Sequence, residues 1–207
     1  MSPFIESIRI QNYKAHLLDL HQKRVNTTLT KWEAKAWLNL EQIVRNLDIQ
    51  EAGLFKLRIV YDIEGNYSTR LVPYVFNKIE SFELVEDNLI DYTYKYENRK
   101  ALDALKKQAK ATEIVIVKNN CITDSSFSNL IFKKEEEWYT PSTYLLNGVQ
   151  RQNLLHEGII KEAEITPENL EQFSHFRLIN AMNPFNQGFT YPTEMLIKRK
   201  PAEEFYL

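Results

Sequence analysis

The chain of 207 residues is long enough for one large domain or two small ones, and 43% of its residues are apolar, which supports a packed core. Its 26 basic and 28 acidic residues give a formal net charge of −2, which argues against nucleic acid or an anionic membrane as the main partner. The single cysteine, Cys121, excludes an internal disulfide and fits a reducing compartment. Because no signal peptide and no run of roughly 20 apolar residues is present, we expect a cytoplasmic protein.

The first half of the chain alternates strand and helix patterns. Residues 4–10 alternate apolar and polar side chains, as a half-buried strand does. We expect helices over residues 15–28 and 31–45, and then two strands over residues 55–61 and 67–75, joined by a turn that contains glycine and asparagine. This order of elements predicts a small α/β domain.

After Phe82 the pattern changes, and we place a domain boundary near residues 83–90, between a domain of residues 1–85 and one of residues 86–207. An aromatic-rich stretch over residues 88–96 leads into a predicted helix over residues 97–110. The later expected elements are a strand at 113–118, an irregular piece bracketed by 121–123 and 129–133, a strand at 136–140, a helix at 148–157 with Gly158 as its C-cap, and a strand at 177–181.

Glycine is scarce, with only five residues in the chain. Rossmann and P-loop folds need clustered glycines where the backbone meets phosphate, and neither GxGxxG nor GxxxxGK[ST] occurs here. If the protein binds a phosphate group, it therefore does so by another route.

Three segments could carry chemistry, although each has a plain structural interpretation by itself. Lys95 lies among tyrosines in residues 92–99 and could be a solvated lysine whose stem packs on aromatic rings. Residues 122–132 could be a hairpin loop, and residues 139–151 could be a strand, a proline turn and a capped helix. Only their order along the chain makes them informative.

Taken together, the segments resemble the fold-type IV pyridoxal phosphate (PLP) enzymes, which include class IV aminotransferases and aminodeoxychorismate lyases. The resemblance spans nearly the whole chain. It rests on F-E-x-[IL]-R (Phe4, Glu6, Ile8, Arg9), H-x-x-R (His21, Arg24), K-x-x-N (Lys95, Asn98), [TS]-[ED]-x(4)-N-[LI] (Thr123, Asp124, Asn129, Leu130) and T-P…G-x-x-R (Thr140, Pro141, Gly148, Arg151). It implies an α+β protein of two domains with the D-amino acid aminotransferase-like fold, a shortened N-terminal domain, PLP between the domains and a homodimeric assembly.

The resemblance also implies roles for two titratable residues. Lys95 would form an imine with PLP, and its amine, once released, would move the substrate's proton. Burial beside a cation would lower the pKa of such an amine. Asp124 would face the pyridine nitrogen and favour its protonated form; many relatives have the longer Glu at this position.

The phosphate group of the cofactor needs donors, which the resemblance places at a helix N-terminus. The backbone N–H groups of Val149 and Gln150 would bind it, and the guanidinium of Arg24 would pair with it. Asn129 would brace the loop that carries the carboxylate, and His21 is expected to be structural. Gln150 stands where many relatives have Thr or Ser, which removes a compact donor but keeps the backbone ones.

The reaction is the least constrained part of the interpretation. Family members carry some tens of residues before the first strand, so we expect a pocket that is either more open or closed by a different element. Asn180, Ala181 and Pro184 resemble the N-A-x-x-P stretch of aminodeoxychorismate lyases, which favours pyruvate elimination from 4-amino-4-deoxychorismate to give 4-aminobenzoate for folate biosynthesis. An aminotransferase for branched-chain or D-amino acids, and a PLP-binding relative without turnover, are the alternatives. Arg58 and Arg99 are candidates for binding a substrate carboxylate.

Overall fold

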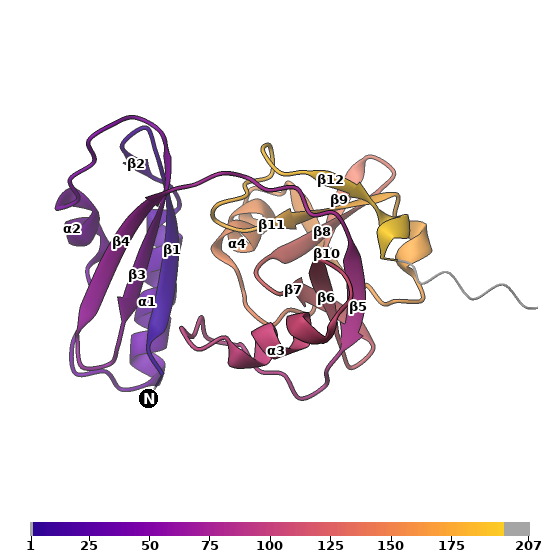
Figure 1. Cartoon of the computed structure of the whole chain (residues 1–207), viewed down its shortest axis with the longest axis horizontal. Coiled ribbons are helices and arrows are strands. Elements are labelled where there is room, and N and C mark those ends of the chain that lie inside the picture. Colours follow the sequence, from indigo (N-terminus) through magenta and orange to yellow (C-terminus); the bar gives the residue numbers. More distant parts are fainter. Residues whose placement is uncertain (1, 197–207) are drawn as a thin grey trace, which may run out of the picture.

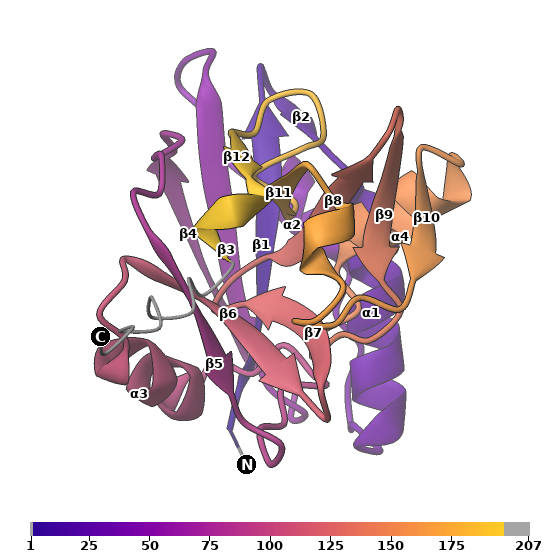
Figure 2. The same ribbon diagram turned by 90° about the vertical axis from the view of Figure 1, so that its right-hand side faces the viewer.

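The computed structural model describes residues 2–196, which form two β-sheets with helices packed against them. Figure 1 shows the two sheets side by side, and Figure 2 shows the first sheet behind the second. The helices are α1 (Leu18–Lys31), α2 (Leu40–Arg45), α3 (Lys100–Gln108) and α4 (Val149–His156). The strands are β1 (Phe4–Gln11), β2 (Lys14–Ala15), β3 (Leu54–Tyr61), β4 (Tyr67–Pro73), β5 (Phe82–Glu86), β6 (Glu113–Lys118), β7 (Cys121–Ser125), β8 (Asn129–Lys134), β9 (Glu137–Pro141), β10 (Ile160–Ala163), β11 (His175–Ile179) and β12 (Thr190–Pro192).

The first sheet is antiparallel, with the strand order β2-β1-β3-β4. Successive side chains of a strand point to opposite faces. In this sheet one face packs in the apolar core and the other lines a cavity. One face presents buried residues such as Ile8 and Leu57 to Val25 and Leu29 of α1. Removing an aliphatic side chain of this kind from water stabilises a fold by about 1.5–3 kcal/mol. The opposite face of β1, which includes Ser7, turns toward the second sheet and helps to line a cavity.

The second sheet is larger and has eight strands in mixed pairing. Its order is β10-β9-β8-β7-β6-β5, with β11 and β12 joined through β8. One apolar cluster, which contains Phe82, Phe132 and Phe176, packs aromatic rings edge to face and in offset stacks. A second cluster places Leu102 of α3 against Ile114 of β6. Ile122 of β7 belongs to the first of these clusters, and Leu154 of α4 packs in a further cluster with Ile131 of β8, so both elements are held against the second sheet.

The chain crosses from the first sheet to the second over residues 74–81, directly before β5 (Figure 1). Strand β5 pairs in parallel with β6, from Phe82 opposite Glu113 to Glu86 opposite Val117. The expected boundary at residues 83–90 therefore lies within and just after a strand of the second sheet. The change of sheet comes before residue 82.

The predicted helix over residues 31–45 is wrong for residues 32–39, and only its first residue and its last part are helical. Helix α1 continues to Lys31, the chain turns at Glu33 with a φ of 48°, and α2 begins only at Leu40. The side chain of Asn39 accepts a hydrogen bond from the Gln42 N–H, so this residue is an N-cap that starts a new helix. The capping signal of an asparagine outweighed the apolar spacing on both sides of it.

Other elements agree with expectation in type, with small shifts of their ends. Helix α4 and strand β6 match the predicted ranges closely, and α3 begins three residues after the expected start. The piece expected to be irregular consists of β7 and β8, joined by a turn at Ser126–Ser128. Strands β5, β10 and β12 were not predicted, because they are short and lack clear alternation. None of the helices within residues 2–196 has the length and hydropathy that crossing a membrane requires.

Candidate active site

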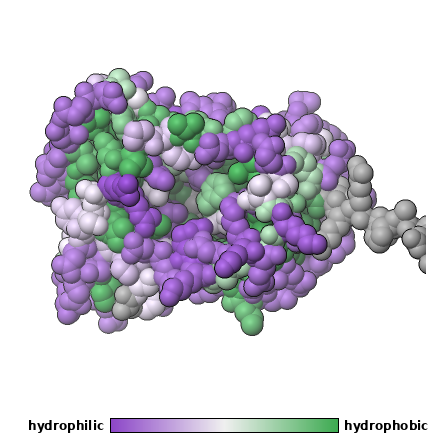
Figure 3. Space-filling model, in the orientation of Figure 1, coloured by the Kyte–Doolittle hydropathy of each residue, from purple (hydrophilic) through white to green (hydrophobic). Residues whose placement is uncertain are grey.

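A cavity of about 240 Å³ lies between the two sheets, and both sheets line it. Figure 3 shows the hollow on this face, bordered by both hydrophilic and hydrophobic residues. The first sheet and α1 contribute Ile5, Ser7, Arg24, Lys56 and Arg58; the rest of the chain contributes Tyr74, Tyr92, Lys95, Arg99, Leu102, Asp124, Ser125, Ser126, Phe127, Ser128, Asn129, Leu145, Leu146, Gly148, Val149, Asn180, Ala181 and Met182. A cavity lined by apolar side chains together with a few charged and polar ones is a favourable place for a small-molecule site.

Lys95 lies on the segment between β5 and α3, and this segment is fixed against β1. The Ile5 N–H donates to the Lys95 carbonyl at 2.8 Å, and Phe4 forms an isolated β-bridge with Tyr96. Burial lowers the pKa of the Lys95 amine to about 8, and the nearby Arg24 guanidinium adds to this effect. At pH 7 about a tenth of this amine is therefore neutral, and so nucleophilic, which is far more than for an exposed lysine.

Asp124 belongs to β7 and is buried, with 5% of its surface exposed. One carboxylate oxygen accepts from Asn129 Nδ2 at 2.7 Å, and the other accepts from the N–H groups of Leu145 and Leu146 at 3.1 and 2.9 Å. Burial raises the pKa of Asp124 to about 6, although these three donors oppose the rise. No cation within residues 2–196 is within ion-pair distance of this carboxylate. The site is therefore suited to a ligand that brings a protonated nitrogen.

Asn129 joins the buried carboxylate to the start of α4. Besides Asp124, its amide nitrogen donates to the Leu146 carbonyl at 2.9 Å. A Cβ at Gly148, the N-cap of α4, would overlap the Asn129 side-chain oxygen, so only glycine fits at this position. The contact keeps the first turn of α4 close to Asp124.

The N-terminus of α4 faces the cavity through Gly148 and Val149. The first intrahelical bond runs from the Gln152 N–H to the Gly148 carbonyl. Within the part of the chain that the structure describes, the N–H groups of Val149, Gln150 and Arg151 have no acceptor. Free donors at a positive helix end form a suitable site for an anion.

Arg24 lies in a buried network with Glu6 of β1. Its Nε and Nη2 donate to the two Glu6 oxygens at 2.8 and 2.5 Å, and the His21 Nδ1 lies 2.5 Å from Glu6 Oε2. Burial alone would raise the pKa of Glu6, but Arg24 and His21 outweigh it and hold the pKa at about 2. The Arg24 Nη1 has no partner among residues 2–196, and Arg24 lines the cavity, so one edge of the guanidinium remains for a ligand.

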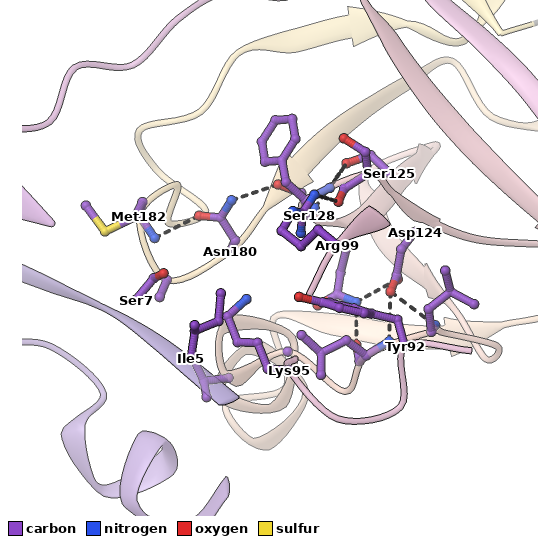
Figure 4. Close-up of a pocket in the computed structure, with 18 of the residues that line it drawn as sticks. Ile5, Ser7, Tyr92, Lys95, Arg99, Asp124, Ser125, Ser128, Asn180 and Met182 are labelled. Atoms are coloured by element: carbon purple, nitrogen blue, oxygen red, sulfur yellow. Dashed lines mark hydrogen bonds between the residues drawn. The ribbon is translucent and has the colours of Figure 1, made fainter. Parts of the chain in front are cut away.

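Most of the residues selected from the sequence come together. Figure 4 shows Lys95, Tyr92 and Asp124 around one cavity, with Asn180 and Met182 on the opposite wall. Lys95, Asp124, Arg24, Asn129 and Val149 all line it, whereas Gln150 does not and is buried behind it. Glutamine at this position therefore offers its backbone N–H rather than its side chain.

The two candidates for a substrate carboxylate also line the cavity, but other groups of the chain already bind them. Arg58 Nη2 lies 3.0 Å from Glu97 Oε1, and Arg99 Nη2 donates to the Ser126 carbonyl at 2.6 Å.

Sequence reasoning missed Lys56 as a site residue. The alternation of Lys56, Leu57 and Arg58 in β3 could have indicated it, since Leu57 faces the core and its neighbours must face the other way.

Comparison with known proteins identifies the family. The profile described as amino-transferase class IV matches residues 4–186. An uncharacterized protein of Haemophilus influenzae is 35% identical over 189 residues, which cover 88% of this chain and 99% of that protein.

Solved structures agree with the profile. A protein of Haemophilus somnus named a "putative 4-amino-4-deoxychorismate lyase" is 35% identical, with a TM-score of 0.81 and coverage of 89% of this chain and 98% of that one. A Mesorhizobium loti protein named a "putative amino-acid aminotransferase" shares the fold, with a TM-score of 0.78, 18% identity and coverage of 93% of this chain and 98% of that one. The chain therefore belongs to the amino-transferase class IV family of PLP-dependent aminotransferases and lyases.

Proposed function

We propose that the protein binds PLP on Lys95 and eliminates pyruvate from 4-amino-4-deoxychorismate, giving 4-aminobenzoate for folate biosynthesis. The observation that carries the proposal is the shared cavity of Lys95, whose amine is easily deprotonated, and Asp124, a buried carboxylate without a cationic partner. The N-A-x-x-P stretch at Asn180 and the name of the Haemophilus somnus relative favour the lyase over other reactions of the family.

The residues present fit the cofactor. The free N–H groups of Val149 and Gln150 and the open edge of Arg24 would hold its phosphate. Gly148 leaves room at the same helix end, because a side chain there would strike Asn129. Asp124 would accept from the ring N–H, and Asn129 keeps that carboxylate in place. When bound, PLP supplies an electron sink for negative charge that develops on a substrate carbon.

The remaining steps belong to the chain's own side chains. The Lys95 Nζ is the group that would take a proton from one substrate atom and deliver it to another. This role requires a pKa near the working pH. Asp124 would hold positive charge on the ring nitrogen, since burial strengthens the attraction between the two groups. Asn180, whose amide donates to Ser128 Oγ at 2.7 Å, gives the opposite wall a fixed polar surface.

Transamination begins with the same proton removal, so it is the alternative activity. The decisive experiment supplies purified protein and PLP with 4-amino-4-deoxychorismate and measures pyruvate and 4-aminobenzoate. A parallel assay supplies branched-chain and D-amino acids with 2-oxoglutarate and measures glutamate. We expect pyruvate in the first assay, and glutamate alone would replace the lyase proposal with an aminotransferase. A bound cofactor band with no product in either assay would favour a relative without turnover.

Two variants test the assignment of the lysine. Lys95→Ala should abolish the visible band of the bound cofactor together with the product. Lys107→Ala is the matched control, because that lysine is exposed on α3 outside the cavity. An unchanged band in Lys95→Ala would refute the role of Lys95.

We also propose that the protein works as a cytoplasmic homodimer, as the family resemblance implies. Exposed apolar side chains, among them Leu89, Trp37 and Tyr144, are available for such a contact. Sedimentation equilibrium would give the mass of the assembly directly. A monomer mass at micromolar concentration would contradict the dimer while leaving the cofactor site unaffected.

A further inference from the structure

Two cations face each other on the first sheet at one end of the cavity. Lys56 of β3 is directly opposite Arg9 of β1 in the antiparallel register, so both side chains leave the same face of the sheet. Lys56 lines the cavity, whereas Arg9 lies beside it and is buried, with 3% of its surface exposed. Like charges in opposed positions destabilise a sheet unless something else compensates them.

All partners of these two cations are neutral. Arg9 donates to the Met182 carbonyl at 3.0 Å and to the side-chain oxygens of Gln11 and Gln187 at 2.7 and 2.6 Å. The Lys56 Nζ makes no ion pair or hydrogen bond within residues 2–196. The Lys56 Nζ lies 5.7 Å from the centre of the ring of Tyr74, which itself lines the cavity.

The other cations of the cavity differ in this respect. Arg24 is paired with Glu6 and Arg58 with Glu97, and Arg99 donates to a backbone carbonyl. Lys95 has its own role as the attachment point for the cofactor. The free edge of Arg24 is assigned to the phosphate of the cofactor. Lys56 is thus, within the described residues, the cation of the cavity wall that has neither a charged partner nor another assigned role.

The position of Lys56 indicates which part of a ligand it would meet. The Lys95 carbonyl accepts a hydrogen bond from the Ile5 N–H. Ile5 of β1 is opposite Val60 of β3, and Val60 is four residues along β3 from Lys56. At about 3.3 Å per residue, the two points of the backbone are roughly 13 Å apart along the sheet. Because the side chains shorten this span, a small substrate could have its amine at Lys95 and an anionic group at Lys56.

We propose that Lys56 is a specificity-determining residue that binds a carboxylate of the substrate remote from its reacting amine, so that the protein selects amines with two carboxylates. The proposal rests on the proposed function only in placing the amine at Lys95. The neutral partners of Arg9 strengthen the effect, since its positive charge adds to the attraction of an anion at Lys56.

Calorimetric titration of the purified protein with glutarate and with pentanoate tests the proposal without the cofactor. The two probes have the same carbon chain, but only glutarate carries a second carboxylate. We expect glutarate to bind more tightly, and Lys56→Met to reduce that preference about tenfold or more, as hydrogen bonds between charged groups do. Lys56→Arg should retain the preference, and Lys107→Met is the control for a lost surface charge.

The second arm uses PLP-loaded protein and follows the cofactor's absorption while glutamate or norvaline, each as a racemate, is added. A preference for glutamate that Lys56→Met abolishes would support the proposal. Equal preference in wild type and Lys56→Met, in either arm, would overturn it. If PLP gives no absorption band but glutarate still binds through Lys56, the proposed function fails and the anion subsite stands; if glutarate also fails to bind, both fail.

Discussion

At the residue scale, the amine of Lys95 differs from the other lysines because it is enclosed near Arg24. Burial and this guanidinium lower its pKa to about 8, so its neutral fraction is half near pH 8 and increases as the pH rises. Acylation of Lys95 in the cofactor-free protein should therefore level off above about pH 8, whereas an exposed lysine follows a midpoint near 10.4. Peptide mapping after pulses of an acylating reagent measures both rates.

The same experiment on Arg24→Gln separates the two causes. Removing the cation should move the Lys95 midpoint to higher pH, because Glu6 would then favour the charged amine. Arg45→Gln is the matched control, since that arginine is exposed on α2 and paired only with Glu41. A wild-type midpoint near that of exposed lysines would show that Lys95 is not activated by its surroundings.

Gly148 is the residue at which the absence of a side chain matters most. A Cβ there would overlap the Asn129 oxygen, and Asn129 cannot move without releasing Asp124 and the Leu146 carbonyl. We expect Gly148→Ala to cost about 1–3 kcal/mol of unfolding free energy, as overpacking does, and to weaken PLP binding. Denaturant titration and cofactor absorbance check the two effects.

Gly188→Ala is the control for this substitution, because a Cβ there meets only ordinary contacts, the nearest being the Leu178 carbonyl at 3.6 Å. Equal stability and equal cofactor binding for the two variants would contradict the idea that Gly148 sets the geometry of Asn129.

At the scale of elements, β1 and α1 are joined by the ion pair of Glu6 and Arg24. The pKa of Glu6 is lowered from 4.5 to about 2, so the folded state gains stability above pH 4.5 and loses it as the pH falls toward 2. This shift corresponds to about 3 kcal/mol. Glu6→Gln should therefore destabilise the protein at pH 7 by roughly 3 kcal/mol, because it leaves a buried arginine unpaired.

The pH dependence of unfolding gives the second measurement on this pair. In Glu6→Gln the decline of stability between pH 4.5 and 2 should be shallower than in wild type, since one strongly shifted carboxyl is gone. Glu41→Gln removes an exposed partner of Arg45 and should change stability by less than about 1 kcal/mol. If the stability of Glu6→Gln and of wild type declined equally between pH 4.5 and 2, Glu6 would not be the cause of that decline.

The sequence predicted those parts of the fold that depend on local signals. The G-x-x-R element placed Gly148 at the start of α4. The pairing of Asp124 with Asn129 across a tight turn was not predicted, because an irregular piece was expected there. The bidentate contact between Arg24 and Glu6 could not be predicted, because it joins a helix and a strand whose approach is set by packing. Lys56 is an intermediate case: the alternation in β3 indicates the face it occupies, but that face becomes a cavity wall only when the second sheet covers it.

At the scale of the whole molecule, the candidate site is made by two sheets that have separate apolar cores. Direct links cross between the two halves, among them the hydrogen bond from Arg9 to the Met182 carbonyl and the ion pair of Arg58 with Glu97. A ligand that contacts Arg24 on one side and Asp124 and α4 on the other would therefore couple the two halves. The stability of the molecule and the occupancy of the site should be linked for this reason.

Thermal unfolding with and without PLP tests that link. At a concentration 100 times its dissociation constant, a ligand adds about 2.7 kcal/mol to the folded state. For a chain of this length, that energy should raise Tm by about 5–10 °C in a single transition. Pyridoxal, which lacks the phosphate, should raise Tm less, because the N–H groups at the start of α4 and the free edge of Arg24 would remain unused. If PLP shifted only one of two separate transitions, the first sheet would contribute nothing to the site. The roles proposed for Arg24 and Lys56 would then both be contradicted.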